Sequence, residues 1–163
     1  MNFNIENTFK EKLYECARHI EKINTAKKKL FRYMPLTVDS YVNLSDAESG
    51  FVDQLIFRFS NLQDTMGENI FPSILKLAQE DTKRKTFIDI LNRLEELGII
   101  SKEEWLKLRE TRNKIAHEYS FNQDEVVESI VNIYNESDRL IAVYEKVYTF
   151  CKEKLLLPGI SND

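Results

Sequence analysis

The helical spacing of its apolar residues is the feature that most constrains the fold of this chain. Apolar side chains recur every three or four residues through almost the whole sequence, which places them on one face of an α-helix. Only 4 of the 163 residues are glycine and 3 are proline. These are too few for the many tight turns of an all-β fold. The pattern therefore predicts an all-α protein.

Turn and capping residues divide this pattern into separate helices. Side chains of the type that caps helix N-termini stand at Ser45, Thr86, Ser101 and Asn122, and Pro72 fits the first turn of a new short helix. The expected helices cover residues 5–33, 47–70, 72–79, 86–97, 101–119 and 122–152. Long helices with short connections predict an antiparallel bundle of four to five main helices. We expect one domain over residues 1–155 and a tail over 156–163.

Composition and charge describe an ordinary globular protein. The formal net charge is −4 and the isoelectric point about 5.4, so general nucleic-acid binding is not indicated and any RNA contact would be local. No run of residues resembles a signal peptide or a membrane span, which predicts a cytoplasmic protein without a membrane partner. Cys16 and Cys151 lie far apart in sequence, and we expect both to be reduced and half-buried in helices.

The sequence also excludes several kinds of chemistry. It has no glycine-rich phosphate-binding loop and no zinc-binding His-Glu-x-x-His motif, so no cofactor and no metal are expected. Its two histidines, His19 and His117, are almost a hundred residues apart. Acid–base chemistry near neutral pH therefore rests on one of them or on a perturbed carboxylate. His19 lies at the edge of an apolar stripe, and we expect it to be structural.

An arginine interrupts the apolar face of the helix that begins at Ser101. That face comprises Trp105, Leu108, Ile115 and Ala116. At about 100° per residue, Arg112 falls in the middle of it, with Tyr119 beside it. Burying a guanidinium without a partner costs several kcal/mol, so Arg112 requires a paired carboxylate, a dimer cleft or a bound phosphate. Arg58 and Asp64 are candidates for the same groove.

The residues after Arg112 carry the other groups that phosphodiester chemistry requires. Asn113 and His117 are four residues apart, so on a continuous helix they would share one flank. Arg112 would then diverge from His117 by about 140°. A two-fold dimer interface would still bring two arginines and two histidines into one groove. Phe57 is expected on the face of its helix opposite the core, where its exposed ring is consistent with contact to a second subunit.

A structural interpretation of the same residues stays open. Arg112 would then form a buried ion pair only. His117 would cap the C-terminus of a helix, where a positive charge is favoured.

The stretch of residues 112–119, RNKIAHEY, resembles the R-x4-H-x-Y motif of HEPN-domain proteins, specifically the HepT-like toxins of toxin–antitoxin pairs. The matching positions are Arg112, Asn113, His117 and Tyr119. The helical layout agrees over roughly residues 5–152, and residues 57–67 are similar to the second helix of such proteins.

The resemblance implies a metal-independent ribonuclease that acts as a homodimer, with its active site at the interface. Arg112 and His117 would be catalytic and Asn113 supporting. It also implies a partner, a minimal nucleotidyltransferase of the MNT type that serves as antitoxin. In HepT-like pairs this partner can transfer AMP to the motif tyrosine, here Tyr119, and a charged adenylate there would repel RNA.

Two other functions remain as alternatives. The chain could be a non-catalytic HEPN binding subunit that docks on a nucleotidyltransferase and presents its substrate. It could also be an inert dimeric bundle in which Arg112 is only an ion-pair partner.

Overall fold

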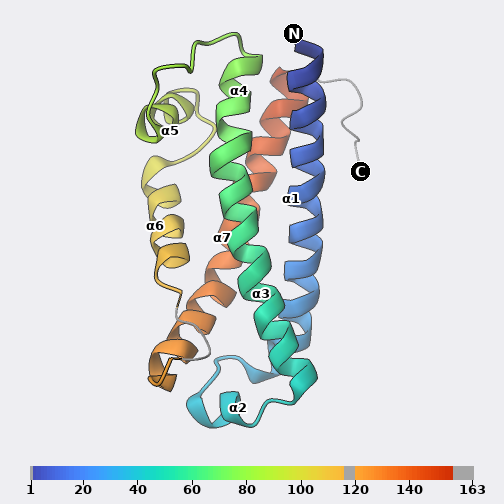
Figure 1. The fold of residues 1–163 in the computed structure, drawn as a ribbon, viewed down its shortest axis with the longest axis vertical. Coiled ribbons are helices and arrows are strands. Elements are labelled where there is room, and N and C mark those ends of the chain that lie inside the picture. The colour runs from blue at the N-terminus through green and yellow to red at the C-terminus, as the bar shows by residue number, and fades with distance from the viewer. Residues whose placement is uncertain (1, 116–119, 156–163) are drawn as a thin grey trace.

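Helices make up most of the chain in a computed structural model, which describes residues 2–115 and 120–155. Over these residues there is no strand, so the predicted all-α class is confirmed (Figure 1). The helices are α1 (Asn2–Leu30), α2 (Val38–Val42), α3 (Asp46–Thr65), α4 (Phe71–Leu77), α5 (Phe87–Glu96), α6 (Lys102–Asn113) and α7 (Gln123–Lys154).

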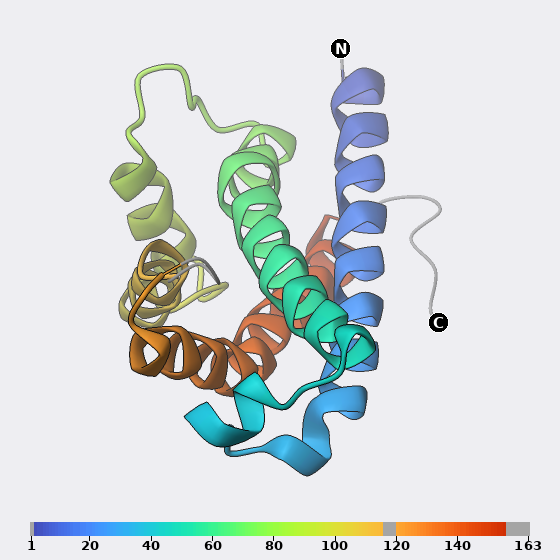
Figure 2. The same cartoon turned by 60° about the horizontal axis from the view of Figure 1, so that its bottom comes forward.

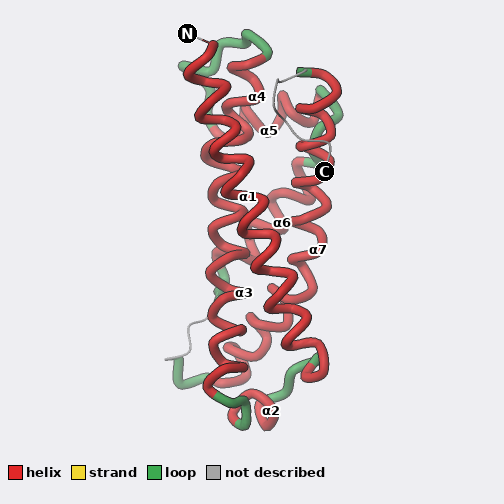
Figure 3. Tube along the Cα trace, turned by 90° about the vertical axis from the view of Figure 1, so that its right-hand side faces the viewer, coloured by secondary structure: helices red, strands yellow, loops and turns green. Residues whose placement is uncertain are grey.

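The long helices lie alongside one another in alternating directions. α1 and α6 run one way, and α3 and α7 run the other (Figure 1). α3 packs against α1, α6 and α7, and α7 also contacts α1 and α6. Figure 2 shows α2 closing the end of the bundle where α1 leads into α3, and Figure 3 shows how elongated the bundle is. This arrangement sets α6 against one side of α3.

The apolar stripes of these helices meet in one core. Its largest fully buried side chains include Phe9, Phe59, Phe71 and Trp105. The rings of Phe71 and Trp105 meet edge to face, with 4.6 Å between centroids and 63° between planes. This contact fixes α6 against the junction of α3 and α4.

Pro72 lies in the first turn of a short helix, α4, as predicted. α3 reaches this helix through a π-helical turn, Met66–Ile70, which the sequence pattern did not predict. In a regular helix, the proline ring would clash with the carbonyl four residues earlier. The widened turn lies next to the proline and keeps the two segments on one continuous path.

The connector predicted over residues 34–46 contains a helix that periodicity missed. The Thr37 side chain accepts from the Ser40 amide, and the Ser40 hydroxyl accepts from the Thr37 amide at 2.9 Å. This reciprocal cap begins α2, which is too short to show an apolar stripe. Ser101 also caps its helix as predicted, accepting from the Glu104 amide at 3.3 Å.

α6 is shorter than predicted. It ends at Asn113, and Lys114 and Ile115 leave the helix. The Ser129 hydroxyl on α7 donates to the Lys114 carbonyl at 3.1 Å, so a terminal carbonyl of α6 is satisfied by a neighbouring helix. The helix predicted over residues 101–119 therefore ends at Asn113, and His117 lies outside the described residues.

The two cysteines are more deeply buried than predicted. Cys16 and Cys151 are both free and fully buried rather than half-buried. Burial raises the pKa of each thiol to about 12, which keeps both protonated and unreactive at neutral pH.

Candidate functional site

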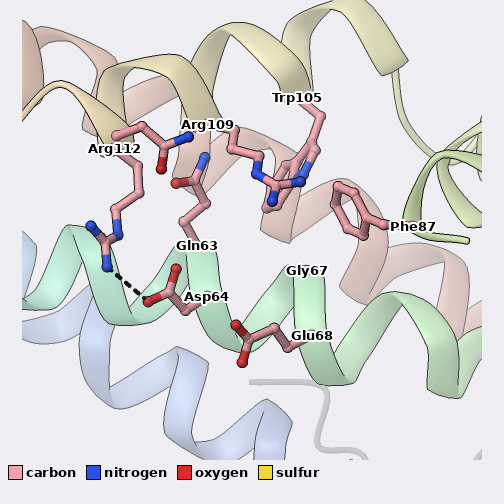
Figure 4. Close-up of a pocket in the computed structure, with 9 residues that line it drawn as sticks. Gln63, Asp64, Gly67, Glu68, Phe87, Trp105, Arg109 and Arg112 are labelled. Atoms are coloured by element: carbon pink, nitrogen blue, oxygen red, sulfur yellow. Dashed lines mark hydrogen bonds and ion pairs between the residues drawn. The ribbon is translucent and has the colours of Figure 1, made fainter.

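A cavity of about 450 Å³ opens where α6 lies against α3 and the π-helical turn (Figure 4). Its lining residues are Gln63, Asp64, Gly67, Glu68, Phe87, Trp105, Arg109, Arg112 and Asn113. Two of the predicted site residues, Arg112 and Asn113, therefore share one cavity. Its volume lies within the roughly 300–1,000 Å³ range of small-molecule sites.

The π-helical turn shapes one wall of this cavity. It contributes Gly67 and Glu68 directly to the lining. A Cβ on Gly67 would lie 3.3 Å from Trp105 Cζ2 and 3.6 Å from Phe87 Cε2. Glycine therefore lets both rings lie against the helix backbone. Single π-helical turns occur frequently at functional sites.

Arg112 reaches across the cavity from the last turn of α6. Its Nη2 donates to Asp64 Oδ2 on α3 at 3.2 Å (Figure 4). The two side chains are 35% and 44% exposed, and a half-exposed pair of this kind stabilises a fold by about 1 kcal/mol or less. Of the partners expected for this arginine, the structure supplies the carboxylate. Asp64 thus lines the same cavity as Arg112.

Several buried polar atoms of this cavity have no hydrogen-bond partner in the described part of the chain. They are Gln63 Nε2, Gln63 Oε1, Trp105 Nε1 and Arg112 Nε. Gln63 is only 3% exposed, and its side chain points from α3 toward α6 (Figure 4). Leaving one buried polar group unsatisfied costs about 1–3 kcal/mol. The wall thus offers a ligand three donors and one acceptor.

The opposite end of the cavity is aromatic. The Arg109 guanidinium lies 4.7 Å from the centroid of the Phe87 ring. Arg109 extends from α6 toward Phe87, and the Trp105 ring reaches into the same end of the cavity (Figure 4). Guanidinium planes and aromatic rings are both surfaces on which a planar heterocycle stacks.

Charges balance among the described residues that line the cavity. Arg109 and Arg112 face the carboxylates of Asp64 and Glu68, so this part of the lining carries two groups of each sign. Such a lining favours a neutral or singly charged ligand over one with several negative charges.

Two of the predicted site residues cannot be placed. His117 and Tyr119 lie outside the described residues, and only Arg112 and Asn113 of the motif are located. Ile115, the last described residue before that stretch, is half-buried against the core.

The second histidine belongs to a different cluster. His19 Nδ1 lies 3.2 Å from Arg58 Nη1, between α1 and α3, so Arg58 does not join Arg112 in the cavity. Burial, and then the positive charge of Arg58, lower the pKa of His19, while Glu15 acts in the opposite direction. His19 is therefore a neutral imidazole packed beside an arginine at neutral pH, consistent with the structural role expected for it.

Analysis of the sequence missed the residues that make this cavity distinctive. Gln63 follows Phe59 by four residues and precedes Met66 by three, so it occupies a core position of its helix, as Arg112 does. This spacing could have identified Gln63 as a polar residue on an apolar stripe. The contribution of Phe87 and Arg109 depends on packing between helices, and no local pattern reveals it.

Within the described ranges there is no group of acidic, histidine or cysteine side chains suited to a metal ion. No helix among those residues is long and apolar enough to cross a membrane.

Comparison with known proteins adds no relative. No protein-family model, no curated protein and no solved structure matches this chain. What the fold and the cavity define is an all-α protein with a charge-balanced cavity that holds unsatisfied polar groups.

Proposed function

We propose that this chain is a metal-independent endoribonuclease, the toxin of a toxin–antitoxin pair, with its active site at a homodimer interface. The observation that supports it best is the position of Arg112. Its guanidinium lines a polar cavity and, among the described residues, pairs with one half-exposed carboxylate, that of Asp64. Arg112 precedes His117 by five residues. If Arg112 served stability alone, a half-exposed ion pair of this kind would contribute little to it.

In the proposed reaction, neutral His117 accepts the proton of a ribose 2′-hydroxyl. The 2′-oxygen attacks the adjacent phosphorus, and the bond from phosphorus to the 5′-oxygen breaks. His117 of the partner subunit, in its protonated form, donates a proton to the leaving 5′-oxygen. The products carry a 2′,3′-cyclic phosphate and a 5′-hydroxyl, and no metal takes part.

Arg112 and Asn113 act on the phosphate in this scheme. The guanidinium neutralises the charge that grows on the phosphorane oxygens, which is where a fixed donor lowers the barrier most. Asn113 lies on the rim of the same cavity and is exposed, so its amide is free to orient the strand.

Control by the partner enzyme would be covalent. A nucleotidyltransferase antitoxin would direct the Tyr119 hydroxyl onto the α-phosphorus of ATP, with release of pyrophosphate. The adenylate on Tyr119 would add bulk and negative charge close to Arg112 and exclude RNA.

A non-catalytic binding subunit is the second candidate function. One observation favours it, because Arg112 is already engaged by Asp64 within its own chain. In that role the chain would dock on a nucleotidyltransferase and present its substrate.

Cleavage of RNA by the purified protein in excess EDTA separates these two functions. We expect the wild type to cut RNA and leave 2′,3′-cyclic phosphate ends, and His117→Ala to be inactive with an unchanged helical circular dichroism spectrum. Cleavage at an unchanged rate in His117→Ala would refute the assignment.

If the wild type is inactive, the intact mass of the same preparation distinguishes two explanations. A mass increased by one or more adenylates would indicate a toxin silenced at Tyr119. An inactive chain of unmodified mass would support the binding-subunit function.

A further inference from the structure

We propose that the cavity between α3 and α6 binds an unpaired adenine base. For a base within RNA, this inference rests on the proposed ribonuclease function, and it assigns to that site a base preference.

The buried amide of Gln63 is the main reason. Its Nε2 donates and its Oε1 accepts, and neither has a partner in the described chain although the residue is only 3% exposed. A glutamine amide with both atoms free makes two parallel hydrogen bonds to adenine, one to the exocyclic amine and one to a ring nitrogen.

The other unsatisfied groups extend this match. Trp105 Nε1 and Arg112 Nε are donors on the same wall, so the cavity offers three donors and one acceptor. Adenine has ring nitrogens as acceptors and a single amino group as donor. Uracil has no amino group, and guanine presents a second donor group, so neither matches this lining as well. Cytosine also pairs one amino group with a ring-nitrogen acceptor, but its single ring covers less of the stacking surface at the aromatic end than the two rings of adenine do.

Charge and shape favour a base over a phosphate inside the cavity. The carboxylates of Asp64 and Glu68 offset the two arginines, which disfavours a polyphosphate, but both can accept from an exocyclic amine. The aromatic end, where Arg109 lies 4.7 Å from the Phe87 ring centroid, provides stacking surfaces. The phosphodiester then remains at the mouth, near Arg112.

The protein contains an intrinsic fluorescent reporter of binding to this cavity. Trp105 is the only tryptophan of the chain and lines the cavity, so its fluorescence reports on ligand entry. The experiment is a titration of the full-length protein with AMP, CMP, GMP and UMP, each followed by Trp105 fluorescence and by calorimetry. Expected is saturable binding of AMP, at least tenfold tighter than that of UMP.

Variants test whether Gln63 reads the base. Gln63→Met keeps the volume and removes both amide atoms, and we expect at least a tenfold loss of AMP affinity. The matched control is Gln54→Met, a half-exposed glutamine of the same helix outside the cavity, which is expected to bind AMP like the wild type. If Gln63→Met does not fold, Arg109→Gln, an exposed position on the stacking side, is expected to weaken AMP binding as well.

Binding and cleavage are measured separately, so the two proposals can fail independently. AMP binding by a protein that cuts no RNA would support the cavity and contradict the nuclease. RNA cleavage without mononucleotide binding, or binding of CMP, GMP or UMP as tight as that of AMP, would overturn the adenine site and leave the nuclease standing.

Discussion

At the scale of single residues, the pairing of Arg112 with Asp64 separates a structural role from a functional one. The pair is half exposed, so its loss costs about 1 kcal/mol or less in free energy of unfolding. Transition-state stabilisation by a positioned donor is worth about 10²–10³ in rate. The two roles therefore predict opposite patterns of stability and activity.

Arg112→Met is expected to lower the rate of RNA cleavage at least 100-fold, within the effect of removing one such donor. The free energy of unfolding, from urea denaturation, should change by no more than about 1 kcal/mol. Arg112→Lys keeps the positive charge but lacks the planar guanidinium. Its rate of RNA cleavage should therefore lie between those of Arg112→Met and the wild type. A large loss of stability with unchanged cleavage would assign Arg112 to the fold alone.

His19 gives the fold a pH dependence whose direction follows from its surroundings. Burial and the Arg58 charge lower its pKa in the folded state, so the unfolded chain binds the proton more readily. The stability that neutral His19 contributes is complete above its unfolded pKa of about 6.5. It is lost as the pH falls from there toward the lower folded value.

His19→Gln should therefore lose less stability than the wild type between pH 7 and pH 5. Urea denaturation at each pH measures this difference, because titratable groups remote from His19 contribute equally to both proteins. An identical decrease in the two proteins would show that His19 titrates normally in the folded state.

At the scale of elements, the π-helical turn is the feature on which the site depends most. Gly67 lets Trp105 and Phe87 lie against the backbone, since an added Cβ would lie 3.3 Å from the indole. Gly50 of α3 is a matched control, because a Cβ there meets nothing within 4 Å.

Gly50→Ala should raise the free energy of unfolding by about 0.5–1 kcal/mol, because alanine restricts the unfolded chain and favours helix. Gly67→Ala should be about 1–2 kcal/mol less stable than Gly50→Ala, because overpacking against the two rings offsets the stabilisation that alanine gives. Thermal denaturation compares the two, and the Trp105 emission maximum should move only in Gly67→Ala. Equal stabilisation of both variants would show that the cavity wall yields without strain.

Local signals predicted most of these elements. The side chains of Ser45, Thr86 and Asn122 cap α3, α5 and α7 as expected, because a cap depends only on the next three residues. Gly98 follows α5 with a left-handed backbone, at a φ of 73°, as is typical of glycine after a helix C-terminus. The π-helical turn was missed because its residues keep apolar spacing close to that of an α-helix. The end of α6 was missed because its terminal carbonyl is satisfied by Ser129 of α7, a tertiary contact that local sequence does not reveal.

The site likewise combines a residue that the sequence predicts with others that depend on tertiary packing. Arg112 was predicted because a charged residue on an apolar stripe is visible in sequence. The unsatisfied indole nitrogen of Trp105 was not, since a tryptophan on a stripe looks like ordinary core. Which donors remain free depends on packing between α3 and α6, and that is a property of the folded chain.

At the scale of the whole molecule, the face of α3 that carries the site is also the face with an exposed aromatic. Phe57 precedes Asp64 by seven residues, two helical turns, so both lie on one side of α3. The Phe57 side chain is 56% exposed. A second subunit on this face would cover Phe57 and set the Arg112 cavities of the two chains near each other, as the proposed shared groove requires.

Phe57→Ser should therefore convert a dimer into a monomer and reduce RNA cleavage together with it. Phe31→Ser is the matched control, because Phe31 is 73% exposed but lies in the short turn after α1 rather than on α3. Light scattering coupled to gel filtration gives the mass, and cleavage is assayed on the same fractions. Because a site built from two chains is lost on dissociation, wild-type activity per chain should also fall on dilution in step with the dimer fraction. A monomeric Phe57→Ser variant that cleaves at the wild-type rate would show that one chain holds a complete site and that Phe57 serves only assembly.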